Sequence, residues 1–151
     1  MGIVVQIHAT VISIEGNAVV LRGPSGGGKS DLALRLIGGG AVLVADDRCD
    51  IVEIDGAVIA SAPAEIAGML EVRGVGIFRL DHQASAPVAL VCDLSNEGDI
   101  ERLPEPYQCR DMCTDFETAI PGVRLAPFEA SAPDKVRVAL RHAIGDLESV
   151  S

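Results

Sequence analysis

Lysine, aromatic residues and positive charge are scarce in this chain of 151 residues. It has two lysines, no tryptophan and a formal net charge of -10. Binding to a phosphate backbone or an anionic membrane requires clustered Lys and Arg, so we expect neither nucleic acid nor membrane as a partner. Lys29 is the only lysine in the first 134 residues, and its position therefore needs an explanation.

Long apolar runs and metal-type cysteine spacing are missing as well. No run approaches the roughly 20 apolar residues of a membrane-spanning helix, and the first 14 residues lack the basic start of a signal peptide. No C-x-x-C pair occurs among the four cysteines, which are Cys49, Cys92, Cys109 and Cys113. Cys109 and Cys113 are spaced to share a helix face, but we expect reduced thiols in a cytoplasmic protein.

The apolar pattern predicts an α/β fold with a mixed sheet in one domain, residues 1–151, because 48% hydrophobic content fills a single core. Strands are predicted at residues 3–14, 18–22, 41–45, 51–54, 58–60 and 87–92. Helices are predicted at residues 29–37 and from a capping box at Ser131 and Asp134 to Leu147. The proline-interrupted stretch 95–121 is predicted to be irregular or partly helical.

The first predicted helix opens inside a glycine-rich motif. The motif G-x-x-x-x-G-K-[ST] is matched by Gly23, Pro24, Ser25, Gly26, Gly27, Gly28, Lys29 and Ser30. Such a P-loop directs backbone N–H groups and a helix N-terminus at phosphate oxygens, while its Lys reaches the outer phosphates and its Ser hydroxyl binds Mg²⁺. The other interpretation is a glycine-rich turn that matches by chance, but a strand before the motif and a helix after it favour a phosphate site.

Carboxylates for a metal ion and a base are expected at the end of a strand. Asp46 and Asp47 follow the strand after the P-loop helix, and Asp93 ends a later strand. Adjacent side chains of an extended segment point in opposite directions, so one of the first pair can serve the metal while the other faces an acceptor. We therefore favour Asp46 and Asp47, although such a pair also commonly begins a turn.

Two weaker signals complete the candidate set. Glu71 and Arg73 precede a Gly-x-Gly, and on a strand they would share a face, where Glu71 can bind metal and Arg73 can meet phosphoryl charge. A surface Glu and Arg beside a turn is the more frequent explanation of this pattern. His8 alone on a strand is more often structural than catalytic.

Taken together, these segments resemble the catalytic domain of HPr kinase/phosphorylase over about the first 95 residues. The resemblance rests on His8 with Thr10, on the P-loop, on the segment 43–48 (LVADDR) and on the segment 70–77 (LEVRGVGI). It implies a P-loop domain of the phosphoenolpyruvate-carboxykinase-like type, in a short form without the N-terminal domain. The segment 120–124 only loosely resembles the Pro-Gly-Arg-Asn stretch tied to dephosphorylation, so kinase activity is predicted and phosphorylase activity is left open.

The resemblance also implies roles for the candidate residues. Lys29 and Ser30 would serve phosphates and Mg²⁺, and Glu71 the metal. The pair Asp46 and Asp47 would supply the base for the acceptor serine, with Asp47 as the first candidate and Asp46 as the next. Asp46 is also a candidate metal ligand. His8 and Arg73 would belong to the same active site.

The implied partner is HPr, the phosphocarrier protein of the sugar phosphotransferase system, and the implied assembly is a homo-oligomer, a hexamer. The phosphate donor is expected to be ATP, with pyrophosphate left open. Two other functions stay open: a P-loop kinase of a small metabolite, and a nucleotide-binding sensor without catalysis.

Overall fold

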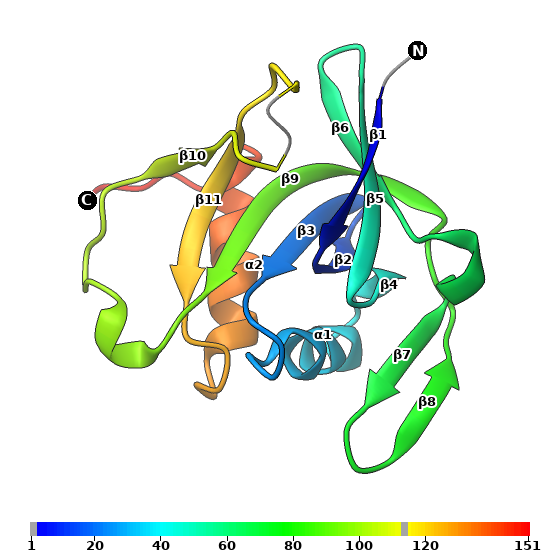
Figure 1. The fold of residues 1–151 in the computed structure, drawn as a ribbon. Helices are drawn as coiled ribbons and strands as arrows, with labels where there is room; N and C mark the ends of the chain where they lie inside the picture. The colour runs from blue at the N-terminus through cyan, green and yellow to red at the C-terminus, as the bar shows by residue number, and fades with distance from the viewer. Residues whose placement is uncertain (1–2, 113–114) are drawn as a thin grey trace.

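The computed structural model describes residues 3–112 and 115–151, which build a large curved sheet with two helices (Figure 1). The strands are β1 Val4–His8, β2 Thr10–Ile14, β3 Asn17–Arg22, β4 Val42–Ala45, β5 Arg48–Ile54, β6 Ala57–Ser61, β7 Met69–Val72, β8 Gly76–Arg79, β9 Ser85–Leu94, β10 Tyr107–Cys109 and β11 Ile120–Leu125. The helices are α1 Lys29–Gly38 and α2 Ala132–Ala143, and two short 3-10 turns cover Ala64–Ile66 and Glu97–Asp99.

The sheet is mixed, as predicted. Its strand order is β1-β5-β6-β9-β3-β2-β4, with β11 beside β9 and β10 beside β11. The long strand β9 pairs antiparallel with β6 but parallel with β3 and β11. The carboxyl ends of β3, β9 and β11 therefore meet at one edge, where α/β proteins bind their ligands. A separate hairpin of β7 and β8 projects from the body of the molecule (Figure 1).

The core lies on both faces of the sheet because side chains alternate along each strand. On one face, Leu21 packs with Leu32 and Leu36 of α1 and with Leu140 of α2. Val20, the neighbour of Leu21, belongs to the cluster on the other face. Each fully buried leucine contributes about 1.5–3 kcal/mol of transfer free energy, which explains why the amphipathic helices stay on the sheet.

The predicted strand 3–14 is in fact two strands that break at Ala9. β1 pairs with β5, whereas β2 pairs with β3 and β4. At the break, the Ala9 N–H donates to the Asp47 carbonyl oxygen at 3.1 Å, and Ala9 is fully buried. Apolar and polar residues keep alternating through the break, with His8 and Thr10 on either side of Ala9, so the sequence pattern did not reveal it.

The predicted irregular stretch 95–121 is also partly wrong, because it contains β10 and the start of β11. Pro121 and Gly122 discourage a strand in sequence, but Pro121 lies near the start of β11 and Gly122 has a steric role. A Cβ at Gly122 would collide with the Tyr107 ring, so glycine permits that ring to lie across β11.

The predictions for the two helices are confirmed in part. The first predicted helix is confirmed as α1, but the Ser131 side chain makes no capping bond and α2 ends at Ala143 instead of Leu147.

Cys109 lies on a strand, which excludes the suggested shared helix face, and Cys113 lies outside the described residues. Burial raises the pKa of Cys49 to about 12, as expected for an inert thiol. Neither helix of the described segments has the length or apolar character that a membrane crossing needs.

Candidate active site around the glycine-rich loop

The glycine-rich loop, residues 23–30, joins β3 to α1 at the ligand-binding edge of the sheet. Gly26 and Gly28 have positive φ angles of 76° and 93°, which side-chain-bearing residues rarely adopt. The Gly27 N–H closes the loop by donating to the Pro24 carbonyl oxygen at 2.8 Å. Because α1 begins at Lys29, its unpaired N–H groups and the positive end of its dipole lie at the loop and favour an anion there.

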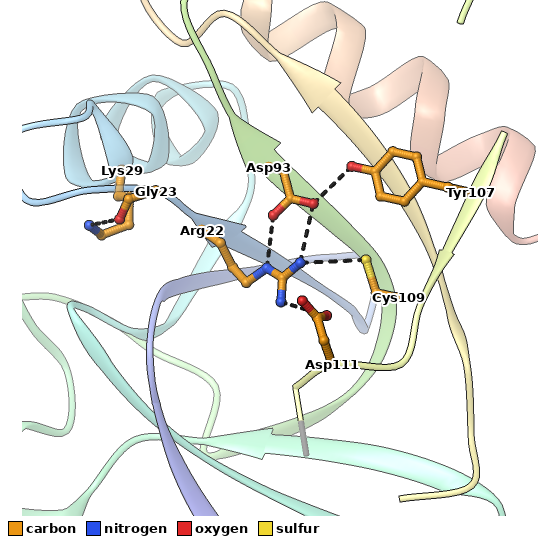
Figure 2. A network of polar contacts seen from close by, with 7 residues as sticks. All are labelled: Arg22, Gly23, Lys29, Asp93, Tyr107, Cys109 and Asp111. Atoms are coloured by element: carbon orange, nitrogen blue, oxygen red, sulfur yellow. Dashed lines mark hydrogen bonds and ion pairs between the residues drawn. The ribbon is translucent and has the colours of Figure 1, made fainter. Parts of the chain in front are cut away.

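Lys29 lies folded against the loop that precedes it. Its ammonium donates to the carbonyl oxygen of Gly23 at 2.8 Å (Figure 2). It also donates to the carbonyl oxygen of Pro24 at 3.1 Å, and the residue is only 8% exposed. The one cation of the loop is thus kept within it, at the place where outer phosphates would bind.

Asp46, at the turn after β4, joins three segments that are distant in sequence. One carboxylate oxygen accepts from the Ser30 hydroxyl at 2.6 Å and from the Thr10 hydroxyl at 3.0 Å. The other oxygen accepts from the Glu71 N–H at 3.1 Å. Asp46 is 9% exposed, so this buried carboxylate fixes β2, α1 and β7 relative to one another.

Asp47 is exposed to solvent, in contrast to the buried Asp46. Its side chain is 62% exposed, and His8 Nδ1 lies 3.9 Å from its carboxylate. Its φ of 69° is uncommon for a residue other than glycine, and the Thr10 hydroxyl helps to hold it by accepting from the Asp47 N–H at 3.2 Å. Such backbone strain persists where surrounding bonds impose it and is concentrated at functional sites.

A cleft of about 560 Å³ gathers most of the predicted residues, and we call it the acceptor cleft. It is lined by Ser25, Gly26, Gly28, Lys29, Ser30, Asp31, Leu34, Asp46, Asp47, Arg48, Ile66, Met69, Glu71, Val72, Arg73, Ile77 and Phe128. Arg73 lies in the turn after β7 and not on the strand, so it does not share a strand face with Glu71. His8 is outside this lining and reaches the cleft only through its contact with Asp47.

The donors at the acceptor cleft suit Mg²⁺. No group of three His, Cys, Asp or Glu residues able to hold a metal occurs within residues 3–112 and 115–151. Mg²⁺ does not need one, because it usually takes one or two carboxylates and completes its shell with water and substrate phosphates. Ser30, Asp46 and Glu71 offer a hydroxyl and two carboxylates beside the loop.

Asp93, the other candidate at a strand end, belongs to a separate network (Figure 2). Arg22 donates to both of its oxygens, at 2.9 and 3.2 Å, and the Tyr107 hydroxyl donates to one of them at 2.8 Å. Arg22 also pairs with Asp111 at 2.9 Å, and burial together with the Asp93 bond raises the pKa of Tyr107. These bonds engage the Asp93 carboxylate in holding β3, β9 and β10 together. Asp46 and Asp47 are therefore the pair of carboxylates beside the loop.

Sequence reasoning missed Arg22, Tyr107 and Phe128. Arg22 and Tyr107 occur in no motif, and both bond to Asp93. Phe128 approaches the loop from the chain that follows β11. The only signal for Arg22 was its place directly before Gly23.

The fold and this site define an α/β protein with a glycine-rich loop beside strand-end carboxylates. Residues 1–96 match the model of the HPr serine kinase C-terminal domain, and the chain belongs to this family. It is 41% identical over 100 residues to the HPr kinase/phosphorylase of Clostridium tetani, covering 66% of this chain and 32% of that protein. It is 46% identical over 72 residues to that of Clostridium botulinum strain Eklund 17B, covering 48% of this chain and 24% of that protein.

The chain therefore spans about a third or less of the length of these curated relatives. A solved structure, that of the Hpr(Ser) kinase/phosphatase from Coxiella burnetii, matches with a TM-score of 0.77 and 23% identity over 91% of this chain and 94% of that one. This likeness shows that the two chains share a fold.

Proposed function

We propose that the chain is the catalytic domain of a cytoplasmic kinase that transfers the terminal phosphoryl group of ATP to a serine of an HPr-type phosphocarrier protein. Its fold would be the P-loop type related to phosphoenolpyruvate carboxykinase. The observation that carries the proposal is the Asp46 junction, which brings Ser30 and Glu71 together under the loop and leaves Asp47 exposed beside them. The family of the chain supports the same reaction.

The loop and the metal donors would bind the triphosphate. Backbone N–H groups of residues 23–30 and the Lys29 ammonium would contact the phosphates. Ser30, Asp46 and Glu71 would hold Mg²⁺, which neutralises phosphate charge when bound. Arg73, at the rim of the cleft, would meet the charge spreading over the transferred group.

Asp47 would act as the base. As the serine oxygen bonds to the terminal phosphorus, the bond between that phosphorus and ADP breaks and the serine proton passes to the Asp47 carboxylate. The exposure of Asp47 lets a protein substrate reach it, and His8 lies close enough to orient its carboxylate. Kinase activity is the direction we propose, and phosphate attack on phosphoserine would use the same groups in reverse.

The hairpin of β7 and β8 would dock the protein substrate. Val75 is 71% and Ile77 63% exposed, and Ile77 also lines the acceptor cleft. Apolar side chains at the mouth of a catalytic cleft are suited to a protein partner. Assembly into a homo-oligomer, a hexamer by resemblance, forms part of the proposal.

The deciding experiment compares Asp47→Asn with Asp55→Asn. Both residues are exposed aspartates with positive φ, 69° and 50°, but Asp55 lies in the turn between β5 and β6. With ATP, Mg²⁺ and HPr, we expect Asp47→Asn to lose at least 100-fold in transfer rate while binding nucleotide normally, because general-base catalysis typically contributes 10²–10⁴-fold.

Asp55→Asn should behave as the unmodified chain does. Phosphorylation of small metabolites but not of HPr would replace the proposal with a metabolite kinase. Nucleotide binding without transfer to any acceptor would replace it with a sensor.

A further inference from the structure

A second cleft, of about 600 Å³, adjoins the glycine-rich loop, and we call it the outer cleft. Its walls are the loop itself, the segment 94–99 after β9 and the segment 126–129 after β11. It meets the acceptor cleft over Ser25, Gly26 and Phe128, which line both. Neither Asp46 nor Asp47 lines the outer cleft, so the chemistry proposed above leaves this space without a role.

The walls of the outer cleft are preformed. The segments after β9 and β11 are tied where the Ser95 N–H donates to the Leu125 carbonyl oxygen at 2.8 Å. Arg35 of α1 holds the segment 126–129, donating to the carbonyl oxygens of Glu129 at 3.1 Å and of Pro127. The cleft therefore lies at the shared carboxyl end of the parallel strands, and Arg35 ties one of its walls to α1, the helix that follows the loop.

Phe128 stands exposed at the junction of the two clefts. It is 70% exposed, and a Cβ added at Gly28 would lie 3.0 Å from its Cζ, so the ring rests beside the loop backbone. Burying a phenylalanine would stabilise the protein, so packing does not explain this position. An exposed aromatic ring is a face on which a nucleobase can stack.

The charge of the outer cleft differs from that of the acceptor cleft. Its lining contains the carboxylates Glu97, Asp99 and Glu129 but no lysine or arginine, and of these Glu129 is paired with Lys135 at 2.8 Å. Carboxylates repel phosphates but accept hydrogen bonds from ribose hydroxyls and from amino groups of a base. A nucleotide that places its phosphates at Lys29 would therefore be directed to put its nucleoside here.

We propose that the outer cleft binds the nucleoside of the phosphate donor, with Phe128 stacking on the base and the carboxylates of Glu97 and Asp99 facing the ribose. This inference rests on the proposed function, and it assigns a use to the space that pyrophosphate, which has no nucleoside, would leave empty. It therefore predicts a nucleotide as the preferred donor.

The absence of tryptophan allows a direct test, since Phe128→Trp introduces a single fluorescent indole. Mg-ATP should quench or shift its emission, whereas Mg-tripolyphosphate, which carries the phosphates alone, should leave it nearly unchanged. An equal response to both ligands would overturn the inference, because the ring would then report only on the phosphates.

Isothermal titration calorimetry on the chain without the introduced tryptophan measures the affinities for Mg-ATP and Mg-tripolyphosphate. Phe128→Ala should weaken Mg-ATP binding about tenfold or more, the scale of one lost base–aromatic stack, and should leave Mg-tripolyphosphate binding within twofold. Phe128→Tyr should restore the ATP affinity. Val138→Ala, a truncation of a 54% exposed residue on α2, is the matched control and should alter neither affinity.

These measurements distinguish failure of the nucleoside inference from failure of the proposed kinase function. If Phe128→Ala leaves ATP binding unchanged, or weakens both ligands equally, the nucleoside does not stack on Phe128 and the inference is wrong while the kinase proposal stands. If the unmodified chain binds neither ligand, the proposed function fails and the inference fails with it.

Discussion

Asp46 accepts three hydrogen bonds at the bottom of the acceptor cleft, whereas Asp47 carries its carboxylate at the surface beside His8. A carboxylate that accepts three bonds is a structural anchor, and of its roughly four lone-pair sites it keeps about one for a metal ion. An exposed carboxylate keeps lone pairs for a proton. The pair would thus divide anchoring and acid–base work between adjacent residues, in line with the base that we propose at Asp47.

Thr10 is the residue on which this division depends. Its fully buried hydroxyl donates to Asp46 and accepts from the Asp47 N–H. We expect Thr10→Val, which keeps the shape and removes the hydroxyl, to lower the free energy of unfolding by about 1–3 kcal/mol, because it leaves buried polar partners unsatisfied. Urea unfolding measures this loss, and phosphotransfer should fall as well.

Thr10→Ser is the control, because it keeps the hydroxyl and removes only a methyl group. It should retain most of the transfer rate. Equal loss of transfer in both variants would show that Thr10 acts through packing and not through its hydroxyl.

At this scale the sequence predicted the residues that occur in motifs. The loop 23–30, Asp46 and Asp47 were chosen because their chemistry requires fixed residue types at fixed spacing. The structure brings Lys29, Asp46 and Asp47 to one cleft, and their catalytic roles stay predictions. Phe128 could not be found in this way, because a lone phenylalanine in sequence is ordinarily a core residue and only its exposure beside the loop indicates a ligand.

At the scale of elements, the strands that were predicted best are those whose turns are local. The β5 and β6 hairpin follows from Asp55 and Gly56, both of which have positive φ. The division of β1 from β2 and the presence of β11 could not be read from sequence, because both depend on pairing with distant strands. Long-range pairing overrides local pattern in such cases.

Glu53 on β5 makes such a long-range contact with Glu117 and Thr118, which we call the Glu53 clamp, and its stability should depend on pH. The Glu53 carboxylate accepts from the N–H groups of Glu117, at 3.1 and 3.2 Å, and of Thr118, at 2.7 Å, and from the Thr118 hydroxyl. These bonds lower the pKa of Glu53 below its ordinary value of 4.5. The clamp is therefore fully present above pH 4.5 and is lost as the pH falls through the lowered pKa.

Amide hydrogen exchange tests the clamp. The protection of the Glu117 and Thr118 amides should decrease as the pH falls below 4.5, after correction for the intrinsic pH dependence of exchange. The Val19 amide, in the buried strand β3 that pairs with a strand on each side, is the internal reference and should keep its protection. If protection falls together at all three amides, the protein is unfolding as a whole in acid and the result does not report release of the clamp.

At the scale of the whole molecule, the projecting hairpin of β7 and β8 and the turn between β5 and β6 both expose apolar side chains. Ile77 is 63% exposed at the acceptor cleft, and Ile54 is 50% exposed beside the other turn. If the projecting hairpin docks a protein substrate, Ile77→Ser should raise the KM for HPr about 5-fold or more. Nucleotide affinity and stability should change little, because the side chain is exposed.

Ile54→Ser makes the same chemical change outside the cleft and should leave the KM for HPr unaltered. Steady-state kinetics with varied HPr at saturating ATP measures both variants. A rise of the KM in the two variants alike would show that losing any exposed apolar side chain weakens HPr binding, and no rise in either would exclude the hairpin from docking.

The resting position of the Lys29 ammonium has a consequence for how any ligand is captured and released. A phosphate that recruits it must first displace two backbone carbonyl oxygens, so capture is an exchange of partners and not the filling of an empty socket. The net gain from this contact would be smaller than that of a free ammonium, because the two carbonyl bonds are lost when the phosphate binds. The same carbonyl oxygens would accept the cation again on release, so this arrangement would favour the departure of a bound phosphate.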